Sequence, residues 1–280
     1  DRPAEQTFRG AACNFVLPPE VTAGIRKLAG AEGTTVYCVL MAAFQAFLSR
    51  VTAQTDMLIG TPLAGRVTEE AESTVGYFVN AVPIRADVSG DPSFTNLLHR
   101  VVGSVIGALD NQEMPLTTLV EELKPPRDTS RSPFFDVVFV LQKPHLLEEC
   151  GDLALYFMAE DDVELRLGEL CMSSVGLPQR HAQFDLTLMM AEHANTISGA
   201  WQYNTAIFKA ATMERWVGLF TNMITHAVGS SSTPVSQLRL MSAEQRRQVV
   251  ETWNDTAGPA RTDACVHQLV EEQVARTPDA

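Results

Sequence analysis

The apolar positions in the first half of the chain recur every three or four residues, which is the spacing of helices packed on a core. Pro18 and Pro19 suit the first turn of a helix, where a missing N–H is harmless, and Gly33 is expected to end it. Thr34 or Thr35 then caps a second helix with a broad apolar face. The helices predicted in this part lie between Pro18 and Gly33, between Thr34 and Arg50, over 94–109 and over 116–123.

Short apolar runs rich in β-branched and aromatic residues predict strands, most of them in the second half. Met57–Ile59 is the first, and Gly60–Pro62 behind it is expected to form a tight turn. The other predicted strands are 79–84, 135–141, 153–158, 165–170, 184–190 and 197–203. A helix over 207–228 follows, and Ser242 with Gln245 predicts a capping box at the start of another. Helices, then strands, then helices indicate an α/β sandwich with a mixed sheet.

Composition and charge remove several classes of function. The chain has 280 residues, 45% of them hydrophobic, which is enough to bury a core. Its 21 Lys and Arg stand against 34 Asp and Glu, and a formal charge of −13 would repel nucleic acid. The longest uncharged stretch, Gly33–Ser49, falls short of the roughly 20 apolar residues of a membrane span, so none is predicted. Five scattered cysteines without a CxxC pair indicate reduced thiols in a cytoplasmic protein and no metal site.

Candidate chemistry is sparse when the residues are read on their own. The sequence has no phosphate-binding loop, no metal-spaced histidine pair and no GxSxG motif. His181 and Asp185 have the HxxxD spacing in which an aspartate orients a general-base imidazole for acyl transfer. However, Phe184–Leu188 alternates like a strand, in which residues four apart have Cα atoms about 13 Å from each other. A self-contained acyltransferase that uses this pair is kept as an alternative.

Four longer strings occur in order along the chain. They are Ile59–Arg66 (IGTPLAGR), Val75–Arg85 (VGYFVNAVPIR), Asn111–Leu116 (NQEMPL) and Arg127–Phe134 (RDTSRSPF). Together with Gly90–Phe94 and Phe184–Leu188, they resemble the later core motifs of condensation domains of non-ribosomal peptide synthetases, which are written roughly IGxFVNT, HQDxPFE and RDxSRNPL. The resemblance covers nearly the whole chain.

The departures from these motifs are mild except for one. Ala81 stands where threonine is usual, Asn111 replaces histidine, Glu113 replaces aspartate, Leu116 replaces phenylalanine and Ser132 replaces asparagine. The large departure is the family's HHxxxDG motif, which belongs to the N-terminal lobe and does not occur in the 280 residues. His181 is no substitute, since Arg180 stands where the first histidine should be.

The resemblance implies a chloramphenicol-acetyltransferase-like αβ sandwich, in which two lobes form a V around a tunnel that carrier proteins enter from opposite faces. Residues 1–240 would be the C-terminal lobe, 241–262 a linker, and 263–280 the start of an adenylation domain. The whole domain joins an acceptor amine to a donor thioester. Both are held by phosphopantetheine on upstream and downstream carrier proteins, so no cofactor is expected to bind this chain directly. Without the N-terminal lobe, the chain is expected to be inactive alone.

The resemblance also implies roles for individual residues of this lobe. An arginine of the C-terminal lobe pairs with the aspartate of HHxxxDG, and Arg66 is the expected one, because a planar guanidinium binds a carboxylate through two hydrogen bonds. Gly76 is expected to have a positive φ, and Asn80 to bond local backbone. The other predicted tunnel-lining or structural residues are Asn111 and Gln112, which line the tunnel or cap a helix, Arg127, Asp128 and Arg131, which brace a turn, and Asp185.

Two further expectations follow if the partner lobe is absent. The segment 170–185 resembles the stretch that crosses to the other lobe, so it should be exposed. The apolar face left bare would favour dimers. Helices that bear Arg26, Lys27 or Arg100 would suit contact with an acidic carrier protein. A third reading, of a different class, makes the chain a non-catalytic docking module that only binds carrier proteins.

Overall fold

The computed structural model describes residues 2–142, 164–193, 195–258 and 263–278, and the predicted strand over 153–158 lies outside these ranges. The chain divides into two compact units, Asp1–Leu240 and Met241–Ala280. The first unit holds the sheet, the main core and all the motif residues that the sequence singles out.

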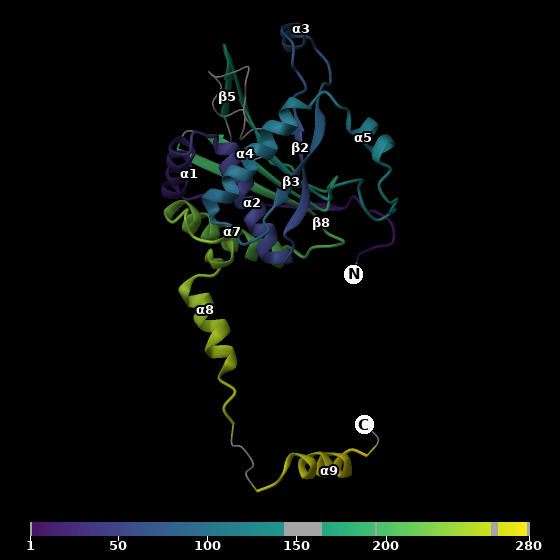
Figure 1. Cartoon of the computed structure of the whole chain (residues 1–280), viewed down its shortest axis with the longest axis vertical. Helices are drawn as coiled ribbons and strands as arrows, with labels where there is room; N and C mark the ends of the chain where they lie inside the picture. The colour runs from purple at the N-terminus through teal and green to yellow at the C-terminus, as the bar shows by residue number, and fades with distance from the viewer. Residues whose placement is uncertain (1, 143–163, 194, 259–262, 279–280) are drawn as a thin grey trace. The chain divides into compact units, whose positions relative to one another are not determined.

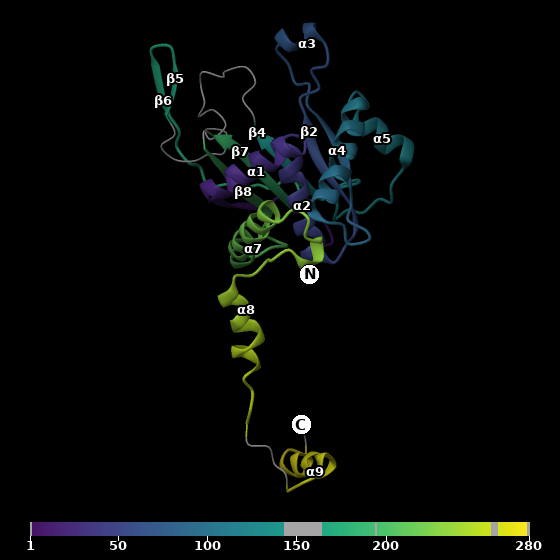
Figure 2. The same ribbon diagram turned by 60° about the vertical axis from the view of Figure 1, so that its left-hand side comes forward.

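A six-stranded sheet organises the first unit, in the order β1-β8-β7-β4-β2-β3 (Figures 1 and 2). The strands are β1 (Gly10–Val16), β2 (Asp56–Leu63), β3 (Asn80–Asp87), β4 (Val137–Gln142), β7 (Leu186–His193) and β8 (Thr196–Asn204). β4 is parallel to both of its neighbours, β2 and β7, whereas the other pairs are antiparallel. The sheet is therefore mixed, as the sequence predicts. A separate hairpin pairs β5 (Glu164–Leu167) with β6 (Leu170–Ser173).

Helices pack on one face of the sheet and enclose the core with it. They are α1 (Pro19–Ala31), α2 (Val36–Thr52), α4 (Phe94–Asp110) and α7 (Ala210–Gly229), with α3 (Glu69–Ser73), α5 (Leu116–Leu123) and the 3-10 helix η1 (Val235–Gln237) in connections. α2 contacts α1, α4 and α7, and every residue from Cys38 to Ser49 is buried. Trp201 of β8 is fully buried between Phe44 and Phe47 of α2 and Phe220 of α7. The prediction of a buried second helix is confirmed.

Helix ends lie where local sequence signals predict them. Thr35 caps α2 by accepting a hydrogen bond from the Cys38 N–H, and Pro19 opens α1. In the second unit, Ser242 and Gln245 form the predicted capping box of α8 (Ala243–Val250). Such caps depend on contacts within one turn of helix, and so the sequence is sufficient to locate them.

Three strand predictions differ from the structure. β2 continues through Gly60–Pro62, where a turn is predicted, because these residues pair with Ala81–Pro83 of β3. The predicted strand over 165–170 is divided by a turn into β5 and β6. β1 is missed, since small and polar residues interrupt its alternation. Its partner β8 is distant in sequence, so pairing rather than local preference defines it.

The second unit contains α8, the 3-10 helix η2 (Thr252–Asn254) and α9 (Val266–Arg276). α9 carries an exposed apolar stripe of Val266, Val270 and Val274, spaced about one helical turn apart. In the described parts of both units, no single helix is long and apolar enough to cross a membrane. α1 and α2 pass that test only as a pair, and the chain bends by 110° between them.

Candidate functional site

The loop between β2 and β3 is gathered around Arg66. One terminal nitrogen, Nη1, donates to the carbonyl of Ala71 and, at 2.7 Å, to that of Thr74. The other, Nη2, donates to the carbonyl of Gly76 at 3.2 Å. The guanidinium carbon lies 4.6 Å from the centre of the Phe78 ring. A guanidinium has five N–H donors, and the three hydrogen bonds leave Nε and one hydrogen of Nη2 without an acceptor among the described residues.

Gly65 supplies the left-handed backbone of this loop. Its φ is +65°, and it approaches the carbonyl of Phe78 so closely that a side chain would not fit. Gly76 has no positive φ, so the prediction for that residue is wrong; it contributes a carbonyl acceptor to Arg66 instead. The tight crossing at Gly65 brings the two arms of the loop together beside the guanidinium.

The same loop presents apolar side chains to solvent. Val75 is 100% exposed and Tyr77 is 88% exposed. α3 projects beyond the end of the sheet in both views (Figures 1 and 2). The segment 170–185 also has exposed apolar side chains, among them Val175 and Leu177. Apolar side chains that gather on a surface are typical of contacts with another part of a protein.

Asn80 joins the start of β3 to the connection between α4 and α5. Its Nδ2 donates to the carbonyls of Gln112, at 3.0 Å, and Met114, at 2.7 Å. Its Oδ1 accepts a hydrogen bond from the Leu116 N–H at 3.2 Å. The side chains of Asn111 and Gln112 donate to carbonyls in the last turn of α4. These three amides therefore bind backbone and hold the connection in place. The prediction that Asn80 bonds local backbone is wrong, because its partners lie 32 to 36 residues away along the chain.

The turn that begins the Arg127–Phe134 string is braced by charge. The Asp128 carboxylate accepts hydrogen bonds from the hydroxyl and the N–H of Ser130, at 2.7 and 2.8 Å, and these hold the pKa of Asp128 below its ordinary value. Arg131 lies 3.7 Å from Asp128 and 2.9 Å from Asp136. Arg131 is thus the arginine that pins the turn, and its two ion pairs are with an aspartate of this string and with one in the residue pair that follows it.

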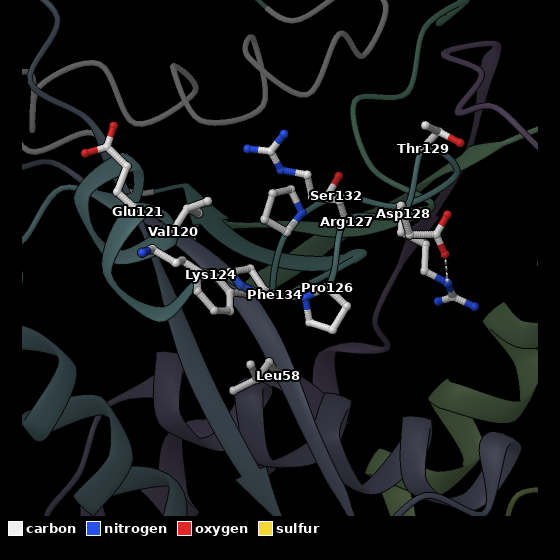
Figure 3. Close-up of a pocket in the computed structure, with 13 residues that line it drawn as sticks. Leu58, Val120, Glu121, Lys124, Pro126, Arg127, Asp128, Thr129, Ser132 and Phe134 are labelled. Atoms are coloured by element: carbon white, nitrogen blue, oxygen red, sulfur yellow. Dashed lines mark ion pairs between the residues drawn. The ribbon is translucent and has the colours of Figure 1, made fainter.

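An open groove of about 1080 Å³ lies beside this turn (Figure 3). Leu58 of β2 and Val120 of α5 give it apolar walls. Glu121, Lys124 and Arg127 also line it, as do Asp128 and Arg131, which form an ion pair. Charges of both signs therefore surround this groove.

Asp185 is buried and paired with Arg2. Both terminal nitrogens of Arg2 donate to the carboxylate, one of them at 3.2 Å, and Nη1 also donates to the carbonyl of Ser130 at 2.9 Å. The side chain of Asp185 is only 7% exposed and that of Arg2 24%. Hydrogen bonding to this carboxylate raises the pKa of Arg2. The sequence gives no signal for Arg2, because its partner is far away along the chain.

The HxxxD pair does not come together in the structure. His181 is exposed, and its backbone forms a bridge with Arg9 at the edge of the sheet. The Asp185 carboxylate is bound to Arg2 and not to an imidazole. Within the described ranges, no three His, Cys, Asp or Glu side chains are placed to hold a metal ion.

A smaller hollow of about 230 Å³ lies on the sheet face that turns away from the helices. Alternation along the strands places Phe139 and Leu188 in the core and hence Val138 and Met189 on this opposite face. The hollow is lined by Thr61, Pro62, Ala81, Val138, Val140, Thr187, Met189 and Gln202 from the strands and by Tyr77, Val79, Phe135, Gln183 and Phe184 from the connections. None of these residues carries a charge.

The mixed sheet with helices on one face, and the motif loops at its end, define an α/β protein of the chloramphenicol-acetyltransferase-like class. The chain belongs to the condensation-domain family, whose pattern it matches over residues 1–250. It is 37% identical over 278 residues to one of the subunits of linear gramicidin synthase from Brevibacillus parabrevis. It is 33% identical over 278 residues to surfactin synthase subunit 1 of Bacillus subtilis (strain 168).

Coverage differs greatly between this chain and its relatives. The two alignments span 99% of this chain but only 5% and 7% of the synthase subunits. A four-domain nonribosomal peptide synthetase bound to AMP and glycine superposes with a TM-score of 0.83 at 22% identity, covering 100% of this chain and 21% of that one. The first condensation domain of the CDA synthetase superposes with a TM-score of 0.65 at 19% identity, covering 85% of this chain and 50% of that chain. These superpositions establish the fold.

Proposed function

We propose that residues 1–240 act as the C-terminal lobe of a condensation domain and contribute to amide formation between two carrier-bound thioesters. The observation that carries this proposal is the coverage: most of this chain superposes on half of a solved condensation domain. The absence of HHxxxDG from the 280 residues supports it too, because the imidazole of that motif would come from an upstream lobe.

The reaction we propose for the whole domain is aminolysis of a thioester. The α-amine of the acceptor attacks the carbonyl carbon of the donor, the C–N bond forms and the C–S bond breaks. The phosphopantetheine thiol of the donor carrier leaves with a proton that balances the one lost from the amine. Holding two tethered reactants in line lowers such a barrier by up to about 7–11 kcal/mol. This lobe would supply one wall of the tunnel and the loop around Arg66.

Arg66 is proposed to pair with the aspartate of HHxxxDG across the lobe interface. Three of its N–H donors hold its own loop, and Nε and the remaining Nη2 hydrogen are left for an outside acceptor. Two donors on neighbouring nitrogens suit a carboxylate with two oxygens. Arg66 would thus fix the position of the loop and of the upstream motif together, as a positioning residue.

The second unit is proposed to lead out of the condensation domain. Residues 241–262 would form the linker, and 263–280 would begin an adenylation domain, in which the apolar stripe of α9 finds cover. Phosphopantetheine would reach the site on the carrier proteins. In the chain alone, the bare side chains of Val75 and Tyr77 are expected to promote association into dimers.

The proposal is tested by amide formation from carrier proteins loaded with donor and acceptor aminoacyl groups, followed by mass spectrometry. The 280-residue chain is expected to give no amide product above the uncatalysed background. The parent synthetase, the larger multidomain protein that we propose contains this chain together with an upstream HHxxxDG motif, is expected to form the amide product. The parent with the second histidine of that motif replaced by alanine is the matched control. Product from the chain alone that disappears on His181→Ala would contradict the proposal and restore the acyltransferase. Carrier binding without turnover by the parent would indicate a docking module.

A further inference from the structure

The small hollow on the sheet face differs in chemistry from the larger groove beside the Arg127 turn. The groove is lined by charged side chains, including Glu121, Lys124 and Arg127, whereas all residues around the hollow are neutral. In a chain with 20% charged residues, a patch of this size without one is a marked local feature. Eight of the thirteen lining residues are apolar and five are polar but neutral, and such a lining suits a small ligand without charge.

The walls of the hollow are built by residues from five strands. Val138 and Val140 of β4 and Met189 of β7 line it, with Ala81 of β3 at one side. Ala81 carries the smallest of these side chains and leaves room that a larger residue would fill. The Phe135 ring, which lies over Gly60 and 5.7 Å from the Phe184 ring centre, closes another side. Strand positions of this kind are fixed by the sheet, so the shape of the hollow is set by the fold.

Two of the five neutral polar residues around the hollow lie next to each other on the sheet. Thr187 and Gln202 are direct cross-strand partners on β7 and β8, and both line the hollow. Thr187 is 9% exposed and Gln202 is half-buried. A hydroxyl and an amide that line the hollow favour a ligand that offers neutral hydrogen-bonding groups beside an apolar body.

We infer that this hollow is the subsite for an uncharged, mainly aliphatic side chain of a carrier-bound thioester substrate, and that Met189, Val140 and Ala81 select it by charge and size. The inference rests on the proposed function, because it assigns the substrate class of that same tunnel. A charged side chain would lose its hydration here without gaining a partner. Gln202 and Thr187 would meet the neutral amide and carbonyl groups of the substrate.

The test is a competition in the parent synthetase. Carrier proteins loaded with leucine, glutamate or lysine compete in one reaction, and the amide products are quantified by mass spectrometry. In one arm the acceptor varies against a fixed donor, and in the other the donor varies against a fixed acceptor, so the arms identify which substrate occupies the hollow. In one of the two arms, the amide product that contains leucine is expected to exceed the product that contains glutamate or lysine by roughly tenfold or more.

Gln202→Glu keeps the shape of the side chain and adds one negative charge. In that variant the ratio of lysine product to glutamate product is expected to rise roughly tenfold in the same arm, because the new carboxylate attracts the lysine side chain and repels the glutamate side chain. Val16→Glu, on an exposed position of β1 outside the hollow, is the matched control and should leave the ratio unchanged. If Gln202→Glu does not fold, Ala81→Leu is the second test variant. Its larger side chain should fill part of the hollow, so the alanine product should increase relative to the leucine product.

The outcomes separate this inference from the proposed function. Loss of all amide product in the parent synthetase would overturn both. Amide formation with no preference for leucine in either arm, or ratios in Gln202→Glu and Ala81→Leu equal to those of the parent, would overturn the substrate assignment alone. Unchanged ratios in both variants would indicate that side chains of another part of the synthetase fill the hollow.

Discussion

Replacing Arg2 with alanine is expected to lower the free energy of unfolding of the 280-residue chain by about 3–5 kcal/mol. The reason is the carboxylate of Asp185, which is 7% exposed and would be left buried without its cation. The hydrogen bond from Arg2 to the Ser130 carbonyl would be lost as well, so the Arg127 turn should loosen. Urea unfolding followed by tryptophan fluorescence measures the change, because Trp201 is in the core.

The control for this prediction is a second Arg–Asp pair in the same unit. Arg85 and Asp56 make two hydrogen bonds at 2.8 and 2.9 Å, but their side chains are 69% and 58% exposed. Arg85→Ala should therefore leave the free energy of unfolding nearly unchanged, since water screens an exposed pair. The double variant Arg2→Met with Asp185→Leu should recover much of the loss, since no charge is left behind. A single Arg2→Ala variant as stable as Arg85→Ala would refute the assignment of a buried pair.

Replacing Arg66 with alanine in the parent synthetase is expected to lower the rate of condensation by roughly 100-fold or more. The loop would lose its three hydrogen bonds to backbone carbonyls, and the aspartate of HHxxxDG would lose the cation we propose for it. Arg66→Lys should recover only part of the rate, because one ammonium group cannot replace the fork of a guanidinium. The rate is measured as amide product formed per minute from loaded carriers.

Arg85 provides a matched arginine for this experiment. It also makes two hydrogen bonds, to Asp56 at 2.8 and 2.9 Å, but it lies at the end of β2 and β3 that is opposite to the loop. Arg85→Ala should leave the condensation rate near that of the parent. Equal rates in Arg66→Ala and Arg85→Ala, with unchanged melting temperatures, would exclude a role for Arg66 in the reaction.

The sequence predicts most of the helices and the core because those features depend on short-range patterns. The apolar spacing of α2 and the Thr35 cap are both local, and both lie where expected. The fold class follows from the order of the elements, and the family from the four motif strings. β1 is missed for the opposite reason, since its identity depends on pairing with β8.

The site is less predictable from the sequence, because its contacts join residues that are distant along the chain. Nothing near Asp185 indicates that Arg2 neutralises it, and the HxxxD spacing suggests a histidine partner instead. Arg66 is singled out by its motif, but its bonds to its own loop become visible only in the folded backbone. Gly76 is a similar case. The motif singles out this glycine as the residue with a positive φ, but in the folded loop that conformation occurs at Gly65.

The most direct test of the central claim, that this chain is one lobe of a two-lobe domain, is amide hydrogen exchange in residues 75–79. In the 280-residue chain these amides donate no backbone hydrogen bond within the described structure, and Val75 and Tyr77 are exposed, so exchange should be fast. In the parent synthetase an upstream lobe should cover this segment and slow its exchange by at least roughly tenfold. Equal exchange rates in the chain and in the parent would contradict the account.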